Sequence, residues 1–218
     1  MIPDPLRMAI ALIPVASYLL LIGLLNIRRC PFLTTGGGDL AALGAALSGL
    51  VLIGPIELFR PEAASADFGG YVWSFLLVFY WLWVWLAILL ARPRLIIYNI
   101  SYDELRPLLA EVARSIDPQS RWAGESLSLP TLGVQLHVET SHIMRNASLV
   151  AAGSKQNLAG WRKLAAHLHK RIHRLRVARN PRSLGIMLLA SLLLALSIWH
   201  MLSDPQRVAQ AMQEMLTL

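Results

Sequence analysis

Four long apolar stretches dominate the pattern of hydrophobic and polar positions along this chain. Each has the roughly 20 residues that a helix needs to cross the hydrocarbon core of a bilayer. Three stretches precede a long polar segment and one follows it. The pattern therefore predicts an integral membrane protein, α-helical in its membrane part, with four transmembrane helices in a 3+1 arrangement. The stretches cover residues 8–27, 40–59, 71–91 and 184–202.

The polar segment between the third and fourth stretches has the periods of a small α+β domain. A β-branched run at residues 95–100 is followed by Ser101 with Glu104 three positions later, which is the signature of a helix-capping box. Pro107 is expected at the edge of this first helix. Strand patterns and a last helix follow, so we predict a β-α-β-β-β-α order. These later elements are expected at residues 126–129, 132–139, 146–151 and 156–180.

These patterns divide the chain into four parts. Residues 1–91 form a three-helix transmembrane region, and residues 92–182 form the α+β domain, which ends in a basic helix. Residues 183–203 form the fourth transmembrane helix, and residues 204–218 an amphipathic tail. The three glycines at 36–38 are expected to make a flexible connection between the first two spans.

The distribution of charge predicts the orientation. The first connection carries Arg28 and Arg29, and the polar segment begins with Arg92 and Arg94, whereas the flanks on the other side are near neutral. Positive residues favour the cytoplasmic side. We therefore expect an inner-membrane or plasma-membrane protein with a cytoplasmic 92–182 domain and both termini outside.

The end of the polar segment is strongly basic. Nine lysines and arginines and no acid lie between Lys155 and Arg182, in a chain whose net charge is +7. Each well-placed charge gains about 1 kcal/mol next to anionic lipids, which predicts contact with the cytoplasmic leaflet. Docking of an acidic partner is the alternative, and membrane tethering makes a nucleic-acid partner unnecessary. The expected contact residues are Arg171, Arg174, Arg176, Arg179 and Arg182.

The second span carries small residues that favour close helix packing. Gly44, Ser48, Gly49 and Gly54 are spaced so that several share one helical face, and small side chains let a neighbouring backbone approach. We expect a central helix, interrupted at Gly54 and Pro55. The partners would be other membrane subunits or a second copy of this chain.

The third span is rich in aromatic residues. Trp81, Trp83 and Trp85, together with Glu57 near the end of the second span, are the residues that would bind a small hydrophobic molecule such as a lipid, quinone or carotenoid. Lipid-facing or interhelical packing explains the same tryptophans without a ligand.

Catalytic and metal chemistry have weaker support. His137 and Glu139 share the wet face of one predicted strand, and Glu57 and His200 lie at similar depth, which would suit an enzyme acting on a lipid-linked substrate. His169 and His173 are four residues apart, but the cations around them disfavour a metal. We predict no catalytic residue, metal or other cofactor. The lone Cys30 excludes an internal disulfide.

The sequence therefore favours an accessory, scaffold or assembly subunit of a membrane complex, leaning away from an enzyme. A carrier or binder of a small hydrophobic molecule is the alternative, and an enzyme on a lipid-linked substrate is third.

Overall fold

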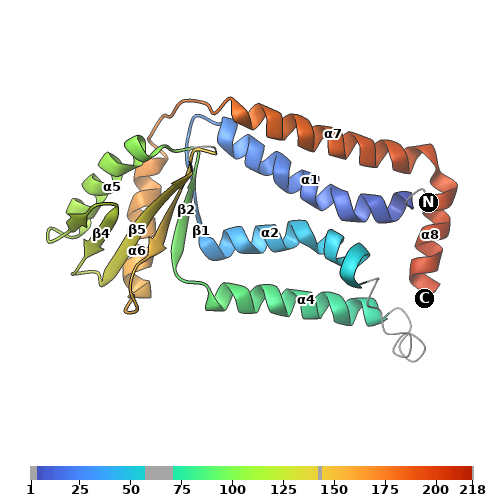
Figure 1. Cartoon of the computed structure of the whole chain (residues 1–218), viewed down its shortest axis with the longest axis horizontal. Helices are drawn as coiled ribbons and strands as arrows, with labels where there is room; N and C mark the ends of the chain where they lie inside the picture. The colour runs from blue at the N-terminus through green and yellow to red at the C-terminus, as the bar shows by residue number, and fades with distance from the viewer. Residues whose placement is uncertain (1–3, 57–70, 142–143, 218) are drawn as a thin grey trace. The chain divides into compact units, whose positions relative to one another are not determined.

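The computed structural model describes residues 4–56, 71–141 and 144–217 (Figure 1). The chain divides into two compact units. The first, here called the helical unit, comprises Met1–Leu21, Leu40–Leu89 and Ile186–Leu218. The second, here called the sheet unit, comprises Ile22–Asp39 and Leu90–Gly185.

Long apolar helices run side by side in the helical unit (Figure 1). Three helical stretches among the described residues are long and apolar enough to cross a membrane: Pro5–Ile27, Gly36–Gly54 and Arg182–Ser203. The expectation of membrane-spanning helices is confirmed to that extent. The apolar part described for α4, Ser74–Leu90, is shorter. The helices are α1 (Pro5–Ile27), α2 (Gly36–Val51), η1 (Leu52–Ile56), α4 (Tyr71–Leu90), α7 (Arg182–Ser203) and α8 (Pro205–Thr217).

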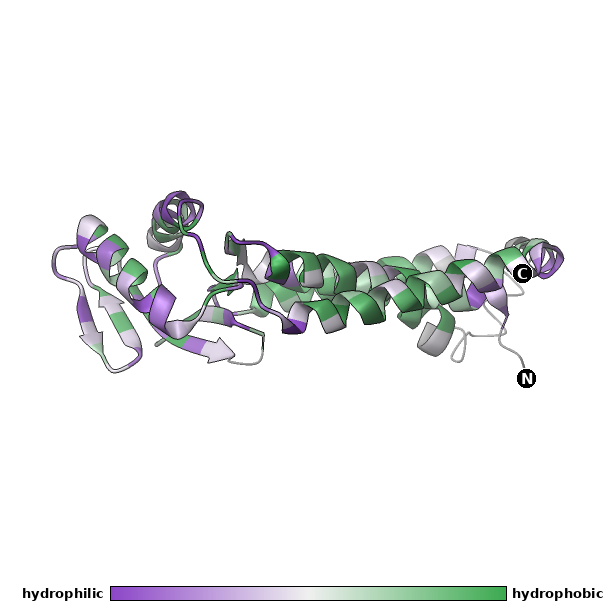
Figure 2. Ribbon diagram, turned by 90° about the horizontal axis from the view of Figure 1, so that it is seen from above, coloured by the Kyte–Doolittle hydropathy of each residue, from purple (hydrophilic) through white to green (hydrophobic). Residues whose placement is uncertain are grey.

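The surfaces of these helices explain why a bilayer suits them. Figure 2 shows hydrophobic residues along most of their length. On α4, Phe75, Leu82 and Leu89 are 60–77% exposed, and on α7 Leu188 and Trp199 are each 72% exposed. So much exposed apolar surface is unfavourable in water and favourable in lipid.

The sheet unit is a two-layer α+β structure. Its six-stranded sheet has the order β1-β2-β6-β5-β4-β3, with every neighbouring pair antiparallel. Helices α5 (Tyr102–Ile116) and α6 (Leu158–Ile172) bury their apolar sides in one core with alternate strand residues. The strands are β1 (Phe32–Thr35), β2 (Arg94–Tyr98), β3 (Arg121–Ala123), β4 (Ser126–Leu129), β5 (Val134–Ser141) and β6 (Asn146–Ala151).

Two strands were not predicted. β1 lies in the first connection, between α1 and α2, and pairs with β2, so that Leu33 is opposite Ile97. β3 has only three residues and forms a hairpin with β4. A strand of three residues such as β3 is too short to show a period of two. β1 pairs with a segment 60 to 66 residues further along the chain, which no local pattern indicates.

The glycines at 36–38 are the first turn of α2, so the prediction of a flexible connection was wrong. The Thr35 hydroxyl accepts a hydrogen bond from the Gly38 amide at 3.2 Å, which caps the helix. Asp39 then accepts a hydrogen bond from the Tyr98 hydroxyl and lies 3.9 Å from the Arg94 guanidinium, which ties the helix start to β2. These contacts offset the poor helix propensity of glycine.

The helices of the sheet unit differ from prediction at two points. α5 begins at Tyr102, so Pro107 lies in its second turn rather than at its edge. α6 ends at Ile172, eight residues before the expected break at Asn180. The chain beyond α6 instead runs beside the end of α1, because the Val177 amide donates to the Arg29 carbonyl at 2.9 Å. That pairing is non-local and has no signature in the helical pattern.

Candidate functional site

Two basic segments of the sheet unit lie next to each other where α1 ends and α7 begins. The Val177 and Asn180 amides donate to the Arg29 and Asn26 carbonyls at 2.9 and 3.4 Å. These bonds bring together arginines from residues 28–29 and 174–182, which are 145 positions or more apart in sequence. We call this set the arginine cluster. It consists of Arg28, Arg29, Arg174, Arg176, Arg179 and Arg182, all of them exposed.

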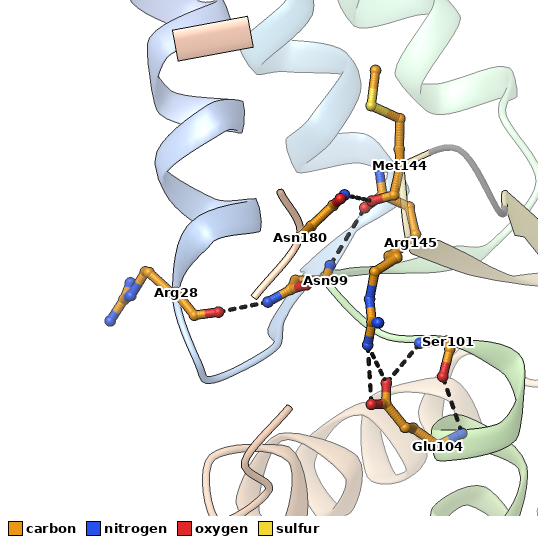
Figure 3. Close-up of polar contacts among 8 residues, drawn as sticks. Arg28, Asn99, Ser101, Glu104, Met144, Arg145 and Asn180 are labelled. Atoms are coloured by element: carbon orange, nitrogen blue, oxygen red, sulfur yellow. Dashed lines mark hydrogen bonds and ion pairs between the residues drawn. The ribbon is translucent and has the colours of Figure 1, made fainter. Parts of the chain in front are cut away.

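A buried polar network connects this cluster to the sheet (Figure 3). The fully buried Asn99 follows β2 and donates from its side-chain amide to the Arg28 carbonyl. Asn180 is 3% exposed and donates to the Met144 carbonyl at 3.4 Å. The Ile100 amide also donates a hydrogen bond to the Arg145 carbonyl at 2.6 Å. The end of α1, the end of β2 and the β5–β6 connection therefore meet through specific hydrogen bonds.

Glu104 is the acidic partner in this network. Its side chain accepts from the Ser101 amide at 2.9 Å, and the Ser101 hydroxyl accepts in return from the Glu104 amide, which completes the predicted capping box. Both carboxylate oxygens also accept from Nη2 of Arg145, at 2.8 and 3.0 Å. Burial raises the pKa of Glu104, but the hydrogen bonds from Ser101 and the charge of Arg145 outweigh burial and lower it below its usual value.

A cavity of about 360 Å³ opens between the first turns of α5 and α7. It is lined by Arg145 and Arg182, by the hydroxyl-bearing Ser101, Thr140 and Ser141, and by apolar residues that include Ile100 and Pro181. Three buried side-chain atoms of the surrounding network have no hydrogen-bond partner among the described residues. They are Oδ1 of Asn26, Oδ1 of Asn99 and Nε of Arg145. The arrangement of cations and hydroxyls suits an anionic ligand.

The five arginines predicted for membrane or partner contact are not equivalent. Arg171 lies on α6 and forms an ion pair with Glu111 at 2.9 Å. Arg176 donates to the Cys30 sulfur at 3.2 Å. Arg182 lines the cavity, while Arg174 and Arg179 are exposed on the segment between α6 and α7. The structure therefore brings four of the five into the arginine cluster, together with Arg28 and Arg29.

The small residues of the second span lie in different surroundings. A Cβ at Gly49 would be 1.9 Å from the Ile10 carbonyl oxygen of α1, and one at Gly44 would be 2.9 Å from Val84 of α4. The Tyr80 hydroxyl also donates to the Gly44 carbonyl at 2.7 Å. Ser48 is half-buried and donates to the Ala45 carbonyl of its own helix. At Gly54, a Cβ would meet no described atom within 4 Å.

Trp81, Trp83 and Trp85 do not line the apolar groove of the helical unit. Trp83 and Trp85 are 58% and 59% exposed, and Trp81 is half-buried. A groove of about 430 Å³ is lined instead by residues of α1, α2, α4, α7 and the π-helical turn, among them Ile13, Ser48 and Leu77. Glu57 lies outside the described residues, and with it any pairing to His200.

Among the described residues, His137 contacts residues other than Glu139, with which the sequence analysis grouped it. His137 contacts Ser126 through Nδ1 at 3.1 Å and Glu125 through Nε2 at 3.8 Å, while Glu139 is exposed two residues further along the strand. His169 and His173 approach to 3.0 Å between their Nε2 atoms. Across the described ranges, no group of three or more His, Cys, Asp and Glu side chains is placed to hold a metal ion.

Two features of this structure escaped the sequence reasoning. The first is the pairing of residues 26–29 with 177–180, which no local pattern indicates. The second is a seven-residue spacing of small buried side chains on α1 and again on α7, a spacing typical of closely packed helices. This signal was readable in the sequence. The residues are Ala9, Ala16 and Gly23 on α1, and Ser183, Ala190 and Ser197 on α7.

Comparisons with known proteins found no relative of this chain. The chain matches no protein-family model, no curated protein and no solved structure. The function must therefore be argued from the geometry of the chain itself.

Proposed function

We propose that this protein is a structural subunit of a membrane complex. Four helices, α1, α2, α4 and α7, lie in the bilayer. The sheet unit contacts partner proteins at the cytoplasmic face, the arginine cluster lies against anionic lipids there, and both termini are outside.

The observation that carries this proposal is the way in which the sheet is built into the membrane-spanning part of the chain. Four residues separate α1 from β1, none separate β1 from α2, and three separate α4 from β2. A long Gly/Ser-rich linker would behave as a flexible coil and would let the attached domain move. Such short connections suit a platform that presents a fixed surface to a partner.

The sheet has a surface suited to that role. Both helices of the sheet unit pack on one face, and on β4 and β5 the alternate residues that point to the other face are polar and half-buried or exposed. The same face carries the apolar Ile96 on β2 and Val150 on β6. Polar surfaces of this kind are common at non-obligate interfaces. The polar side chains are those of Ser126, Ser128, Gln135, His137, Glu139 and Ser148.

Native mass spectrometry of the protein, extracted from its own membranes in mild detergent, tests the proposal. We expect a larger complex of defined stoichiometry, whose other subunits are then identified by proteomics. Gln135→Lys places a charge on the open face of the sheet and should reduce the fraction in the complex at least fivefold. Gln119→Lys makes the same change on an exposed turn and should leave the complex intact. Free monomers or homo-oligomers in the unmodified preparation would overturn the proposal.

A second candidate function, binding of a small hydrophobic molecule, is favoured by the apolar groove of the helical unit. At about 430 Å³ the groove has the size of a small-molecule site, and its lining is almost entirely apolar. Extraction of the purified protein followed by mass spectrometry should then yield one stoichiometric non-phospholipid compound.

A pair of variants separates this binding from general association with lipid. Ser48→Phe fills the groove and should remove the compound. Leu47→Phe adds a similar ring to the neighbouring position, which lies outside the groove lining, and should retain it. Equal retention in both variants, or no stoichiometric compound at all, would exclude this second function.

A further inference from the structure

We infer that the cavity between the first turns of α5 and α7 binds the phosphate group of an anionic phospholipid. This cavity is here called the head-group pocket. The inference requires the cytoplasmic orientation of the sheet unit, but it does not depend on a partner subunit.

The lining of the head-group pocket matches the chemistry of a phosphodiester. Arg145 and Arg182, whose side chains end in guanidinium donors, line the same cavity of about 360 Å³ as Ser101, Thr140 and Ser141, whose side chains carry hydroxyl groups. Guanidinium groups bind phosphate oxygens through charge-assisted and often bidentate hydrogen bonds. A phosphate diester offers only acceptors, so donors from both sides of the cavity would converge on it.

Arg145 has a donor that the described residues do not use. Its hydrogen bonds to Glu104 run through Nη2, while Nε is buried and has no acceptor among the described residues. A buried donor without an acceptor is unfavourable, so a ligand oxygen that displaced the covering atoms and reached Nε would be stabilising. Arg145 also has φ +51°, a left-handed conformation that is uncommon for a side chain of this size. Such residues often occur at binding sites.

The electrostatic surroundings also favour an anion. The arginine cluster adds five further guanidiniums on the segments at 28–29 and 174–179, beside Arg182 of the pocket itself. The N-termini of α5 and α7, helices of 15 and 22 residues, both reach the pocket, through Ser101 and Arg182. The N-terminus of α7 has no acid in its first turn and contributes about half a positive charge from the helix dipole, whereas Asp103 and Glu104 offset that of α5.

The position of the pocket along the chain selects a lipid over a free ion. Arg182 is both a lining residue and the first residue of α7, one of the helices long enough to span a membrane. The first residue of a span lies at the level of the lipid head groups. Anionic head groups on the cytoplasmic leaflet are therefore the phosphates nearest to the pocket.

Titration of the purified full-length protein with phosphatidylglycerol or phosphatidylcholine of the same acyl chains, followed by native mass spectrometry, tests the inference. We expect one tightly bound phosphatidylglycerol and at least tenfold weaker binding of phosphatidylcholine. Arg182→Gln removes a pocket cation, and Ser141→Phe fills the cavity without a change of charge. Each should weaken the first phosphatidylglycerol at least tenfold. Arg162→Gln removes the same charge from the exposed side of α6 and should bind as the unmodified protein does.

Three outcomes would overturn the inference. One is equal affinity for the two lipids, and another is loss of binding in Arg162→Gln to the same extent as in Arg182→Gln. The third is displacement of the lipid by millimolar inorganic phosphate, which would assign the pocket to a free anion. Circular dichroism identifies a variant that has not folded, and Ser141→Phe and Arg182→Gln test the pocket independently. The measurement follows lipid on the isolated chain, so its result is separate from that of the complex experiment.

Discussion

Asn99 and Arg145 show how a few residues fix the geometry of the polar network. Both have a left-handed backbone, with φ +57° and +51°, and each follows or precedes a strand at which the chain must change direction. Asparagine tolerates this conformation better than most residues, whereas arginine does not. Arg145 is held there by the Ile100 amide on its carbonyl and by Glu104 on its side chain. These two contacts stabilise Arg145 in its left-handed backbone conformation.

Replacement of Glu104 tests the energetic role of this network. Glu104→Gln removes the charge that Arg145 and the Ser101 amide bind, so the free energy of unfolding should fall by about 1–2 kcal/mol at neutral pH. Thermal or denaturant unfolding of the purified protein in detergent measures the change. Glu111→Gln removes an exposed carboxylate paired with Arg171 and should change stability by less than about 0.5 kcal/mol.

The same variant predicts a pH dependence. The pKa of Glu104 is lower in the folded protein than its ordinary value of 4.5, so the folded state favours the charged form. Its contribution is complete above the unfolded pKa and is lost as pH falls through the lower, folded value. The stability difference between the unmodified protein and Glu104→Gln should therefore shrink below pH of about 4.5. A difference that stayed constant from pH 7 to pH 3 would contradict this assignment.

Helices and strands with a local sequence pattern were predicted, whereas pairings between segments far apart in the chain were not. The capping box, the amphipathic α5 and α6 and the alternation in β5 all follow from nearest-neighbour patterns, and the structure has each of them. β1 and the extended segment after α6 depend on partners far along the chain. Within the site, sequence reasoning identified four members of the arginine cluster and the capping box. It did not identify the cavity, which exists only because separate segments meet.

Packing between the spans should depend strongly on one glycine. Gly49→Ala places a methyl group 1.9 Å from the Ile10 carbonyl oxygen, so the helices must move apart, at a cost of about 1–3 kcal/mol. Gly54→Ala meets no described atom and should leave the melting temperature unchanged or slightly higher. Thermal unfolding in detergent compares the two. Equal effects of the two variants would show that α1 and α2 do not rely on this contact.

For the whole molecule, the unmodified chain already carries a reporter of its orientation. Cys30 is the lone cysteine and lies in the first connection, which we predict to be cytoplasmic. A membrane-impermeant maleimide should therefore leave Cys30 unlabelled in intact cells and label it after the membrane is opened. In a Cys30→Ser background, Gln210→Cys on the exposed side of α8 should be labelled in intact cells. The reverse pattern would invert the topology.

The strand in the first connection has a consequence for synthesis of the protein. β1 leaves the ribosome before α2 and α4, but β2, its one neighbour among the described strands, begins 62 residues later. Until then the hydrogen-bonding groups of β1 have no strand to pair with, and the outer position of β1 in the sheet means that it joins β2 at one side only. The sheet therefore cannot close until α2 and α4 have been synthesised. With these helices in the bilayer, as proposed, pairing of β1 with β2 would follow their insertion.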